Sequence, residues 1–437
     1  MIGVFDSLQA ELARIVTSFR VGRIAGIGRG TLSVTGLAQA AALGDRVLIR
    51  GKGAVVGGEV LALAPGDLTV LPEGAADGLA IGDAVELTGR AEIAPDDSWI
   101  GRIVDAFGKP LDGRALPQGV KSRPLCAAAP AAASRRRLGA RLSTGVAVFD
   151  TLLPLVRGQR LGLFAGSGVG KSSLLAKFAR GVAADVVVIA LVGERGRELR
   201  EFTDGVLGPQ GMARSVVVTA TSDQSPLIRR RCAWTAMAVA EHFRDQGLQV
   251  LLLVDSITRF AEAHREVALA AGESGNLRGF PPSTAHTIMA LAERAGPGPE
   301  GMGDITAVFS VLVAGSDMEE PVADILRGAL DGHVVLDRRI AERGRYPAID
   351  LLRSVSRSLP DAASPEENEL IAQARRLLGA YDRAEMMIQA GLYAKGSDPL
   401  VDAAIRVWPA LDAFLAEDAA DGIEGSFRKL IACLATR

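Results

Sequence analysis

The chain has 437 residues, 48% of them hydrophobic and 23% charged, with a formal net charge of −2. This composition is typical of a globular protein with two or three domains, and the small net charge excludes a general attraction to nucleic acid or acidic lipid. The longest apolar runs fall short of the roughly 20 residues that a membrane span needs, and no signal peptide is evident. The three cysteines are far apart and form no C-x-x-C pair, which argues against a disulfide framework and a zinc site. We therefore expect a cytoplasmic protein.

The first 19 residues carry an apolar stripe. Phe5, Leu8, Leu12, Ile15 and Phe19 recur every three or four residues, which places them on one face of a helix. Such a terminal helix either docks on the next domain of its own chain or binds a partner protein. We take this segment as an amphipathic partner-binding helix and leave the first alternative open.

Residues 20–92 have the sequence texture of a small β-barrel. Short runs of Val, Ile, Leu and Thr are separated at close intervals by Gly, Pro and Asp, which is typical of all-β folds. Residues 93–141 follow as a connector rich in Pro and Ala. We expect its three consecutive arginines, Arg135–Arg137, to form a solvated surface rather than a binding patch.

Residues 142–359 alternate apolar strands with helical stretches, which predicts an α/β domain. The runs over 185–193, 250–256 and 305–315 are rich in Val, Ile and Leu without alternation, as expected for strands buried on both faces of a parallel sheet. The strands stop there, and helical periodicity predicts a small helical domain over 360–437. The predicted fold is an α/β P-loop NTPase core, with a parallel sheet flanked by helices, between an N-terminal β-barrel and a C-terminal helical domain.

The stretch LFAGSGVGKSSLL, residues 163–175, places flexible backbone between a strand and a helix. Its pattern A-x-x-x-x-G-K-S is that of a phosphate-binding P-loop in which Ala165 stands where glycine is usual. In such a loop the N–H groups and the helix N-terminus point at phosphate oxygens, Lys171 neutralises the β- and γ-phosphates, and Ser172 ligates magnesium. An ordinary glycine-rich turn is the alternative. The predicted nucleotide-binding residues are Ala165, Gly166, Ser167, Gly168, Val169, Gly170, Lys171, Ser172 and Ser173.

Two carboxylates follow buried strands. Asp255 ends the run VLLLVD, where a lone carboxylate is costly unless it serves an ion, so it would hold Mg²⁺ through water; capping the next helix is its alternative role. Glu194 would orient and polarise the attacking water, and its neighbour Arg195 could touch the γ-phosphate. A surface salt-bridge network among Glu194, Arg195, Arg197 and Glu198 is the competing interpretation. Ligands collect at the carboxyl ends of parallel strands, so we expect Lys171, Glu194 and Asp255 to lie together.

Several motifs resemble those of one protein family. The segments AGSGVGKS, VGERGRE, VDSITRFA, DGHVVLDRRIAERGRYPAID and AGLYAKGSDPLVDAAI occur in that order. Together they resemble the ATPases of bacterial type III protein export, the flagellar branch in particular, which are related to subunits of rotary ATP synthases. The resemblance extends from about Arg20 to Phe414, and the segment PAIDLLRSVS over 347–356 is similar to a signature of the wider family.

The resemblance implies an export ATPase that uses ATP and Mg²⁺ and works as a homohexamer, with its sites at subunit interfaces. Arg357 matches the arginine that reaches into a neighbour's site, unless it is only a surface charge, and Tyr346 matches the ring that stacks on adenine. The hydrolysis would drive unfolding, chaperone release or delivery of export substrates.

The same resemblance implies partners and a location. A regulatory stator-like protein would bind the N-terminal helix, and a central stalk-like protein would enter the ring channel. Export substrates and their chaperones would bind as well. The chain would be peripheral to the inner membrane at the export gate and not integral to it.

Two other functions have to be weighed against export. A non-catalytic ring subunit typically lacks the carboxylate at the position of Glu194, whereas this chain has both Glu194 and Arg357, which favours the enzyme. A ring-shaped RNA-translocating motor would need aromatic stacking platforms in its barrel. Residues 20–98 contain no Phe, Tyr or Trp, so we expect no nucleic-acid partner.

Overall fold

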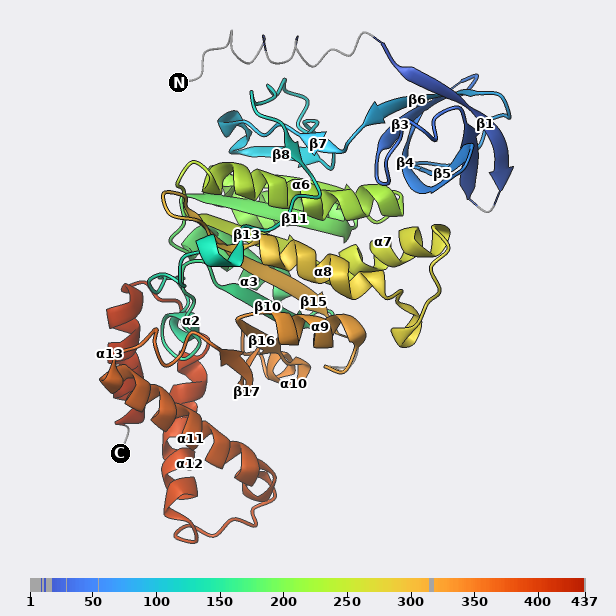
Figure 1. Ribbon diagram of the computed structural model, residues 1–437. Helices are drawn as coiled ribbons and strands as arrows, with labels where there is room; N and C mark the ends of the chain where they lie inside the picture. The colour runs from blue at the N-terminus through green and yellow to red at the C-terminus, as the bar shows by residue number, and fades with distance from the viewer. Residues whose placement is uncertain are drawn as a thin grey trace.

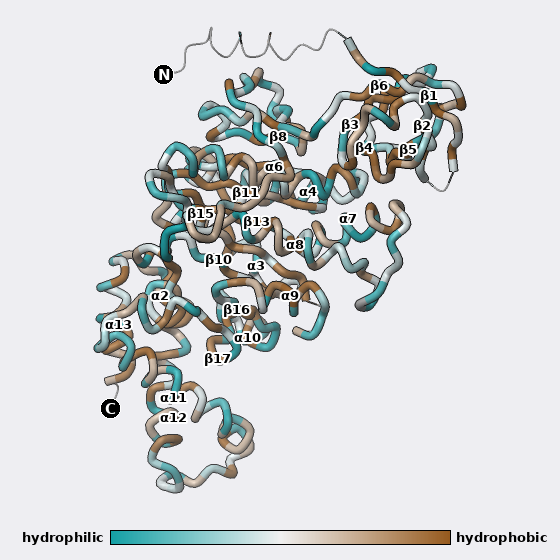
Figure 2. Tube along the Cα trace, viewed as in Figure 1, coloured by the Kyte–Doolittle hydropathy of each residue, from teal (hydrophilic) through white to brown (hydrophobic). Residues whose placement is uncertain are grey.

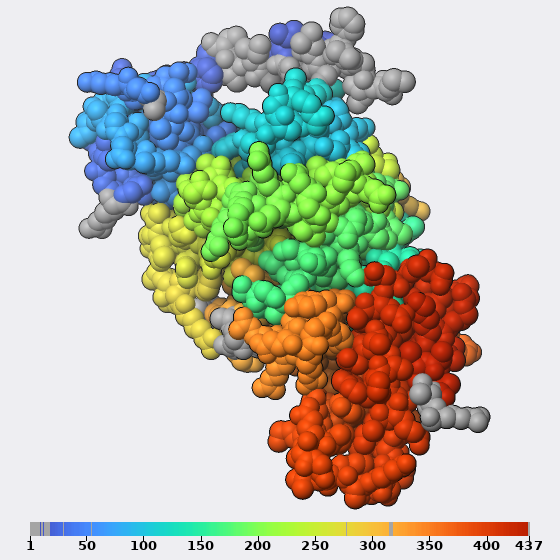
Figure 3. All heavy atoms as spheres, turned by 180° about the vertical axis from the view of Figure 1, so that it is seen from behind, coloured from blue at the N-terminus to red at the C-terminus, as the bar shows by residue number. Residues whose placement is uncertain are grey.

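The computed structural model describes Gln9, Leu12 and residues 18–28, 30–53, 55–313 and 318–435. The expected helix over residues 1–19 therefore lies almost entirely outside the described residues. A barrel, a large sheet with its helices, and a group of C-terminal helices follow one another along the molecule (Figure 1). Seen from behind, the barrel and the C-terminal helices again lie at opposite ends (Figure 3). This arrangement confirms the predicted fold class.

Six short strands close into the barrel in the order β1-β2-β5-β4-β3-β6, and neighbouring strands are antiparallel. Alternate residues point inward, as in β5, where Leu68 and Val70 are buried. The interior is a cluster of Ile, Leu and Val side chains. The strands are β1 (Arg20–Gly28), β2 (Thr31–Thr35), β3 (Arg46–Arg50), β4 (Val55–Ala64), β5 (Asp67–Pro72) and β6 (Ala84–Gly89).

The central sheet has the strand order β17-β16-β10-β15-β13-β11-β12-β8, and β14 pairs with β15. Its strands are parallel except for the pairs β16–β17 and β14–β15. Strands β11, β13 and β15 are buried almost throughout, which explains their unbroken apolar sequences. The strands are β8 (Arg102–Asp105), β10 (Arg160–Ala165), β11 (Val186–Glu194), β12 (Ser215–Thr221), β13 (Val250–Asp255), β14 (Gly296–Pro297), β15 (Asp304–Leu312), β16 (Gly332–Leu336) and β17 (Ile349–Ser356).

Helices cover both faces of this sheet. One buried cluster joins the sheet to α6, α7, α8 and α9, with Phe243 and Phe260 among its largest members. A second cluster joins the other face to α3 and the C-terminal helices, through Phe178 and Phe414. In Figure 2 the hydrophobic colour recurs along the strands, and the hydrophilic colour is common in the outer loops. The helices are α2 (Ala147–Asp150), α3 (Lys171–Gly181), α4 (Gly196–Arg200), α5 (Gly208–Met212), α6 (Pro226–Arg244), α7 (Ile257–Ala270), α8 (Ser283–Arg294), α9 (Pro321–Ala329) and α10 (Arg338–Glu342).

Three helices form the C-terminal end: α11 (Pro365–Gln389), α12 (Pro399–Phe414) and α13 (Gly422–Leu434). A capping box starts α11, because the Ser364 hydroxyl accepts from the backbone N–H of Glu367 while the Glu367 carboxylate accepts from that of Ser364. Asp398 caps α12 through the backbone N–H of Leu400. In the part of the chain that the structure describes, no helix is long and apolar enough to cross a membrane.

The segment over residues 93–141 is joined to the α/β part more closely than its composition indicates. It supplies β8, which pairs with β12 at the edge of the central sheet, and the ribbon of β7 (Glu92–Ile93) and β9 (Arg123–Pro124). The prediction that its three consecutive arginines form a solvated surface is wrong for Arg135, whose side chain is only 16% exposed, whereas the side chain of Arg136 remains 42% exposed. Arg135 pairs with Glu293 at 3.2 Å and Arg136 with Asp304 at 2.5 Å, because these carboxylates border the path of the segment.

Charged and aromatic side chains attach the barrel to the α/β part. The guanidinium groups of Arg46, from the barrel, and Arg231, from α6, each lie 4.7 Å from the ring centroid of Phe107. Glu59 of the barrel also pairs with Arg230 of α6 at 2.5 Å. Cation–π contacts and ion pairs of this kind fix the orientation of two groups rather than merely bury area. The barrel is therefore held in a defined position over α6.

We expect a buried ion pair to be a point of weakness in this fold. Glu241 of α6 and Arg294 of α8 are almost fully buried and make two hydrogen bonds, of 2.8 and 2.7 Å. Arg294→Met would leave the Glu241 carboxylate buried without its partner, which should lower the free energy of unfolding by about 3–5 kcal/mol. Urea unfolding followed by far-ultraviolet circular dichroism measures this loss.

The matched control replaces both partners with apolar residues. The double variant Glu241→Leu with Arg294→Met should regain much of the stability, because no unpaired charge stays buried. Wild-type stability in the single variant would contradict the assignment.

Candidate active site

The P-loop connects β10 to α3 at the carboxyl edge of the central sheet. Ala165 is the buried last residue of β10, and its carbonyl accepts from the N–H of Val313. Gly168 and Gly170 adopt φ of 77° and 87°, a left-handed backbone that favours glycine. Gly170 is the N-cap of α3 and provides no side-chain cap, so the first N–H groups of α3 are open to an anion. Gly166, Ser167, Val169, Ser172 and Ser173 complete this loop and the first turn of α3.

The structure brings the three predicted charged residues together. The Lys171 ammonium contacts Oδ1 of Asp255 and lies 3.9 Å from Oε1 of Glu194. Lys171 follows β10, Asp255 ends β13 and Glu194 ends β11, so their strands all finish at the same edge of the sheet. The three side chains are mostly buried, with exposed fractions of 12% for Lys171, 4% for Asp255 and 22% for Glu194.

Asp255 is not the cap of the following helix. Ser256 is the N-cap of α7, and its hydroxyl accepts from the N–H of Arg259 at 3.3 Å. Oδ1 of Asp255 instead accepts a hydrogen bond of 2.6 Å from the hydroxyl of Ser310 in β15. Its carboxylate is thus committed to the site and not to the helix end.

A small cavity of about 160 Å³ adjoins these residues. Ser172, Glu194 and Asp255 line it on the polar side, together with Glu198 of α4. The sequence predicts Glu198 only as a member of a surface salt-bridge network, and because Glu194 ends β11 while Glu198 lies in α4, their spacing gives no signal of this shared cavity. Glu201 and four apolar side chains complete the wall, the latter being Leu191, Leu199, Phe202 and Val206.

The pKa of Glu194 is raised to about 7 in this environment. Burial is the main cause, and the hydrogen bond with Glu198 and the negative charge of Asp255 add to it. The Lys171 ammonium acts in the opposite direction. A carboxyl group with such a pKa is suited to exchange protons near neutral pH.

The donor set fits magnesium only when it is bound together with a nucleotide. Among the described residues, no cluster of three or more His, Cys, Asp or Glu side chains could hold a metal ion by itself. Mg²⁺ commonly takes one or two protein ligands and fills its shell with water and phosphate oxygens. The Ser172 hydroxyl and the Asp255 carboxylate, which both line this cavity, match that requirement.

Two further predicted residues lie near the P-loop. The ring of Tyr346 packs over Gly170, since a Cβ atom built on that glycine would lie 3.0 Å from Cδ1 of the tyrosine. About half of Tyr346 is exposed, which leaves a ring face available for stacking. Arg195 is turned outward, with a side chain 78% exposed and 3.7 Å from Glu198. Arg195 and Glu198 thus form part of the predicted surface network, while the neighbouring carboxylate of Glu194 is mostly buried.

Arg357 is not part of this cluster. It directly follows β17, which runs antiparallel to β16. Arg357 therefore lies where the parallel strands begin, whereas Lys171 lies where they end. Its guanidinium donates to the carbonyls of Leu330 and Arg327, each at 3.1 Å. Strand β10 spans six residues between these two edges, a rise of about 3.3 Å each. The side chain of Arg357 therefore cannot reach the P-loop of its own chain.

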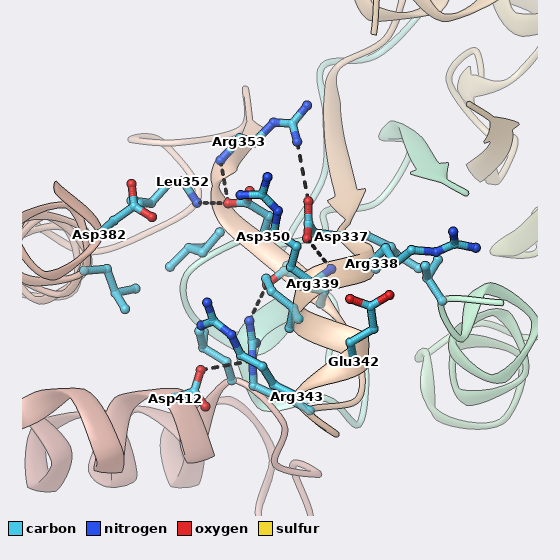
Figure 4. Close-up of a pocket in the computed structure, with 18 of the residues that line it drawn as sticks. Asp337, Arg338, Arg339, Glu342, Arg343, Asp350, Leu352, Arg353, Asp382 and Asp412 are labelled. Carbon is cyan, nitrogen blue, oxygen red and sulfur yellow. Dashed lines mark hydrogen bonds and ion pairs between the residues drawn. The ribbon is translucent and has the colours of Figure 1, made fainter. Parts of the chain in front are cut away.

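A larger cavity of about 790 Å³ opens on the outer side of the P-loop, between α10, β17 and the C-terminal helices (Figure 4). Gly166 and Ser167 reach its wall, whereas Lys171, Glu194 and Asp255 do not line it. Ion pairs cross it from the α/β part to the C-terminal helices, Arg343 to Glu385 at 2.8 Å and Arg345 to Asp412 at 3.1 Å. Figure 4 also shows Arg353 reaching toward Asp337.

Family models match most of the chain. The nucleotide-binding domain of the ATP synthase alpha/beta family matches residues 145–356, and the T3SS EscN ATPase C-terminal domain matches residues 363–430.

Known proteins resemble it over nearly its full length. The flagellum-specific ATP synthase of Caulobacter vibrioides is 44% identical over 434 residues, which is 97% of this chain and 98% of that protein. The assembled ATPase EscN of the enteropathogenic E. coli type III secretion system is 35% identical and covers 95% of this chain and 100% of its own, with a TM-score of 0.87. Assembled EscN in complex with its central stalk EscO is 36% identical with the same coverage, and its TM-score is 0.86.

The raised pKa of Glu194 predicts how ATP hydrolysis depends on pH. In its predicted role toward the attacking water, Glu194 must be ionised to accept a proton, so kcat/KM should fall as the pH drops below about 7. Glu198→Gln removes the negative charge that raises this pKa and replaces it with an amide that can donate to the ionised Glu194, so the fall should move to lower pH in that variant. Initial rates between pH 5.5 and 8.5 measure both profiles. A wild-type profile that is flat over this range would contradict the assignment.

Proposed function

The chain belongs to the ATP synthase alpha/beta family, in its branch of flagellum-specific ATP synthases and type III secretion ATPases, and on this basis we propose that it is a homohexameric ATPase that drives protein export. The observation that carries the proposal is that Lys171 of the P-loop contacts Asp255 and lies near Glu194, where strands β10, β13 and β11 end. Hydrolysis would serve unfolding, chaperone release or delivery of export substrates.

Each residue of the site has a distinct role in this proposal. Lys171 leaves Asp255 and binds the β- and γ-phosphates, while the N–H groups from Gly166 to Ser173 hold the remaining phosphate oxygens. Ser172 would hold Mg²⁺ through its hydroxyl, and Asp255 would hold it through water. The ion, when bound, neutralises charge on the phosphates. Glu194 orients the attacking water and accepts its proton, for which its raised pKa is suited.

The base and the γ-phosphate would be contacted from the rim of the site. We assign adenine stacking to Tyr346, because its ring lies over the P-loop with one face exposed. Arg195 directly follows Glu194 and would turn toward the γ-phosphate, because its ion pair with Glu198 is exposed and readily exchanged.

Arg357 would complete the site of a neighbouring subunit. Its position at the opposite edge of the sheet supports a contribution in trans, since one chain cannot join it to its own P-loop. The description of EscN as an assembled ATPase supports the same arrangement. A chain with Glu194 and Arg357 carries both halves of an interfacial site, which favours a ring of working sites over a non-catalytic subunit.

The partners follow from the family. A protein like the central stalk EscO, which is bound to EscN, would occupy the ring channel. A stator-like regulator would bind residues 1–19, and chaperones and export substrates would bind in turn. We place the protein in the cytoplasm, peripheral to the inner membrane at the export gate. We propose no nucleic-acid partner, because the barrel lacks aromatic side chains for base stacking.

Two substitutions should separate binding from chemistry. Lys171→Ala removes the cation from the phosphate cradle, so it should abolish hydrolysis and greatly weaken ATP binding. Glu194→Gln should retain ATP binding, because an amide still bonds to water, but it should lose turnover by 10²-fold or more, on the order expected for a general base. Equilibrium binding of a fluorescent ATP analogue and steady-state phosphate release measure the two effects. Wild-type turnover in Glu194→Gln would refute its role.

Mixed rings should reveal the contribution in trans. Neither Arg357→Ala nor Lys171→Ala should hydrolyse ATP as a pure protein, because an arginine finger is worth about 10³-fold or more in rate. Mixing them creates interfaces that join the intact P-loop of one variant to the intact Arg357 of the other, so activity should return in part. Native mass spectrometry verifies that the rings are mixed. Absence of recovery in such rings, or a fully active monomer, would contradict a trans arginine.

A further inference from the structure

Ser310 makes a hydrogen bond to Asp255 that has no part in the roles assigned above. It lies in β15 and is fully buried, and its hydroxyl donates to Oδ1 of Asp255 at 2.6 Å. A short O–H···O⁻ bond of this kind is charge-assisted and roughly twice as strong as a bond between neutral groups. The contact therefore fixes the orientation of a carboxylate that has little access to solvent.

The register of the sheet makes this contact inevitable. Strand β15 lies between β10, which leads to the P-loop, and β13, which ends at Asp255. Phe309 is the partner of Val254, and the next residue along each strand is Ser310 and Asp255. The pairing of the two strands thus places the hydroxyl of Ser310 beside the carboxylate of Asp255.

Two donors share the same oxygen of Asp255. The Lys171 ammonium and the Ser310 hydroxyl both contact Oδ1, and no hydrogen bond from the described residues reaches Oδ2. The ammonium sits on a flexible stem and moves to the phosphates in the proposed function. The Ser310 hydroxyl, on a short side chain of a central strand, stays within hydrogen-bond distance of Asp255. After Lys171 has moved, Ser310 is the side chain that still orients Asp255.

We propose that Ser310 is a positioning residue for Asp255, one that keeps Oδ2 directed toward the Mg²⁺ site while Lys171 serves the phosphates. This inference rests on the proposed function, because it assumes that Asp255 supports Mg²⁺ binding. A purely structural role makes a different prediction. A serine that only satisfies its own hydroxyl would affect the stability of the sheet and leave the response to Mg²⁺ unchanged.

The test compares nucleotide binding with and without the metal. The affinity for a fluorescent trinitrophenyl-ATP is measured in EDTA and in saturating Mg²⁺, alongside the Mg²⁺ concentration for half-maximal hydrolysis. Ser310→Ala removes a single oxygen atom, and Ser310→Thr keeps the hydroxyl. Thr258→Val is the matched control: it removes another buried hydroxyl, which accepts from the N–H of Leu312 at the end of the same strand and does not touch Asp255.

The proposal expects a selective loss. Ser310→Ala should bind the analogue normally in EDTA, lose about tenfold of the affinity gained from Mg²⁺, and need about tenfold more Mg²⁺ for hydrolysis, as expected for one lost bond to a charged group. Ser310→Thr should restore both values, and Thr258→Val should match the wild type in both.

Three outcomes would overturn it. An equal loss in EDTA and in Mg²⁺ for Ser310→Ala would show a general structural effect. A wild-type Mg²⁺ response in Ser310→Ala, with a weakened response in Asp255→Asn, would uphold the metal role of Asp255 and reject that of Ser310. A wild-type response in Asp255→Asn as well would reject the metal role of Asp255, and the inference about Ser310 with it.

Discussion

One ammonium and two carboxylates share the edge of an almost wholly apolar sheet, and the surrounding architecture serves to keep them together. An ion removed from water is tolerable only when a partner of opposite charge stands within reach. Lys171 meets this requirement for Asp255 and, at a greater distance, for Glu194. Three parallel strands must therefore end level with one another. The central position of β15 sets the spacing between the P-loop strand and the strand of Asp255.

The antiparallel turn from β16 to β17 has an equally large effect. It sends Arg357 back to the far edge of the sheet, where backbone carbonyls of Leu330 and Arg327 hold its guanidinium. The P-loop and Arg357 therefore lie at opposite ends of the sheet's strands. The barrel is held over α6 through Phe107 and the paired arginines, so it belongs to the same framework as the strands that carry the carboxylates.

Sequence reasoning succeeds here where the signal is local. The P-loop, the buried strands and the two carboxylates at strand ends each rest on a short run of residues, and the structure brings Lys171, Asp255 and Glu194 together as expected. It fails where the partner is distant along the chain. Strand β8 is four residues long and pairs with β12, more than 100 residues later, so no pattern within it indicates a place in the sheet. Arg136 likewise gains its partner, Asp304, from a strand far away in sequence.

Ser310 shows a subtler limit. The run over residues 305–315 correctly predicts a buried strand. The sequence of that run, however, does not indicate which residue of the neighbouring strand Ser310 contacts. Only the register between β13 and β15 reveals that its neighbour is Asp255. Glu198 shows the same limit, because Glu194 ends a strand while Glu198 lies in the helix that follows, so their separation in the sequence indicates no contact. Its position beside the carboxylate of Glu194 is apparent only from the cavity that both line.

The aliphatic interior of the barrel has a practical consequence for optical spectroscopy. All three tryptophans, all three tyrosines and all thirteen phenylalanines of the chain lie outside residues 20–98. The barrel is therefore silent in near-ultraviolet absorption and emission. Trp408, by contrast, stacks on Tyr381 with ring centroids 4.1 Å apart at the cavity beside the C-terminal helices. Intrinsic fluorescence of this protein thus reports on the α/β part and on the packing of its C-terminal helices, and it senses the barrel through Arg230, which pairs with Glu59 of the barrel and lies 4.7 Å from the ring of Trp234.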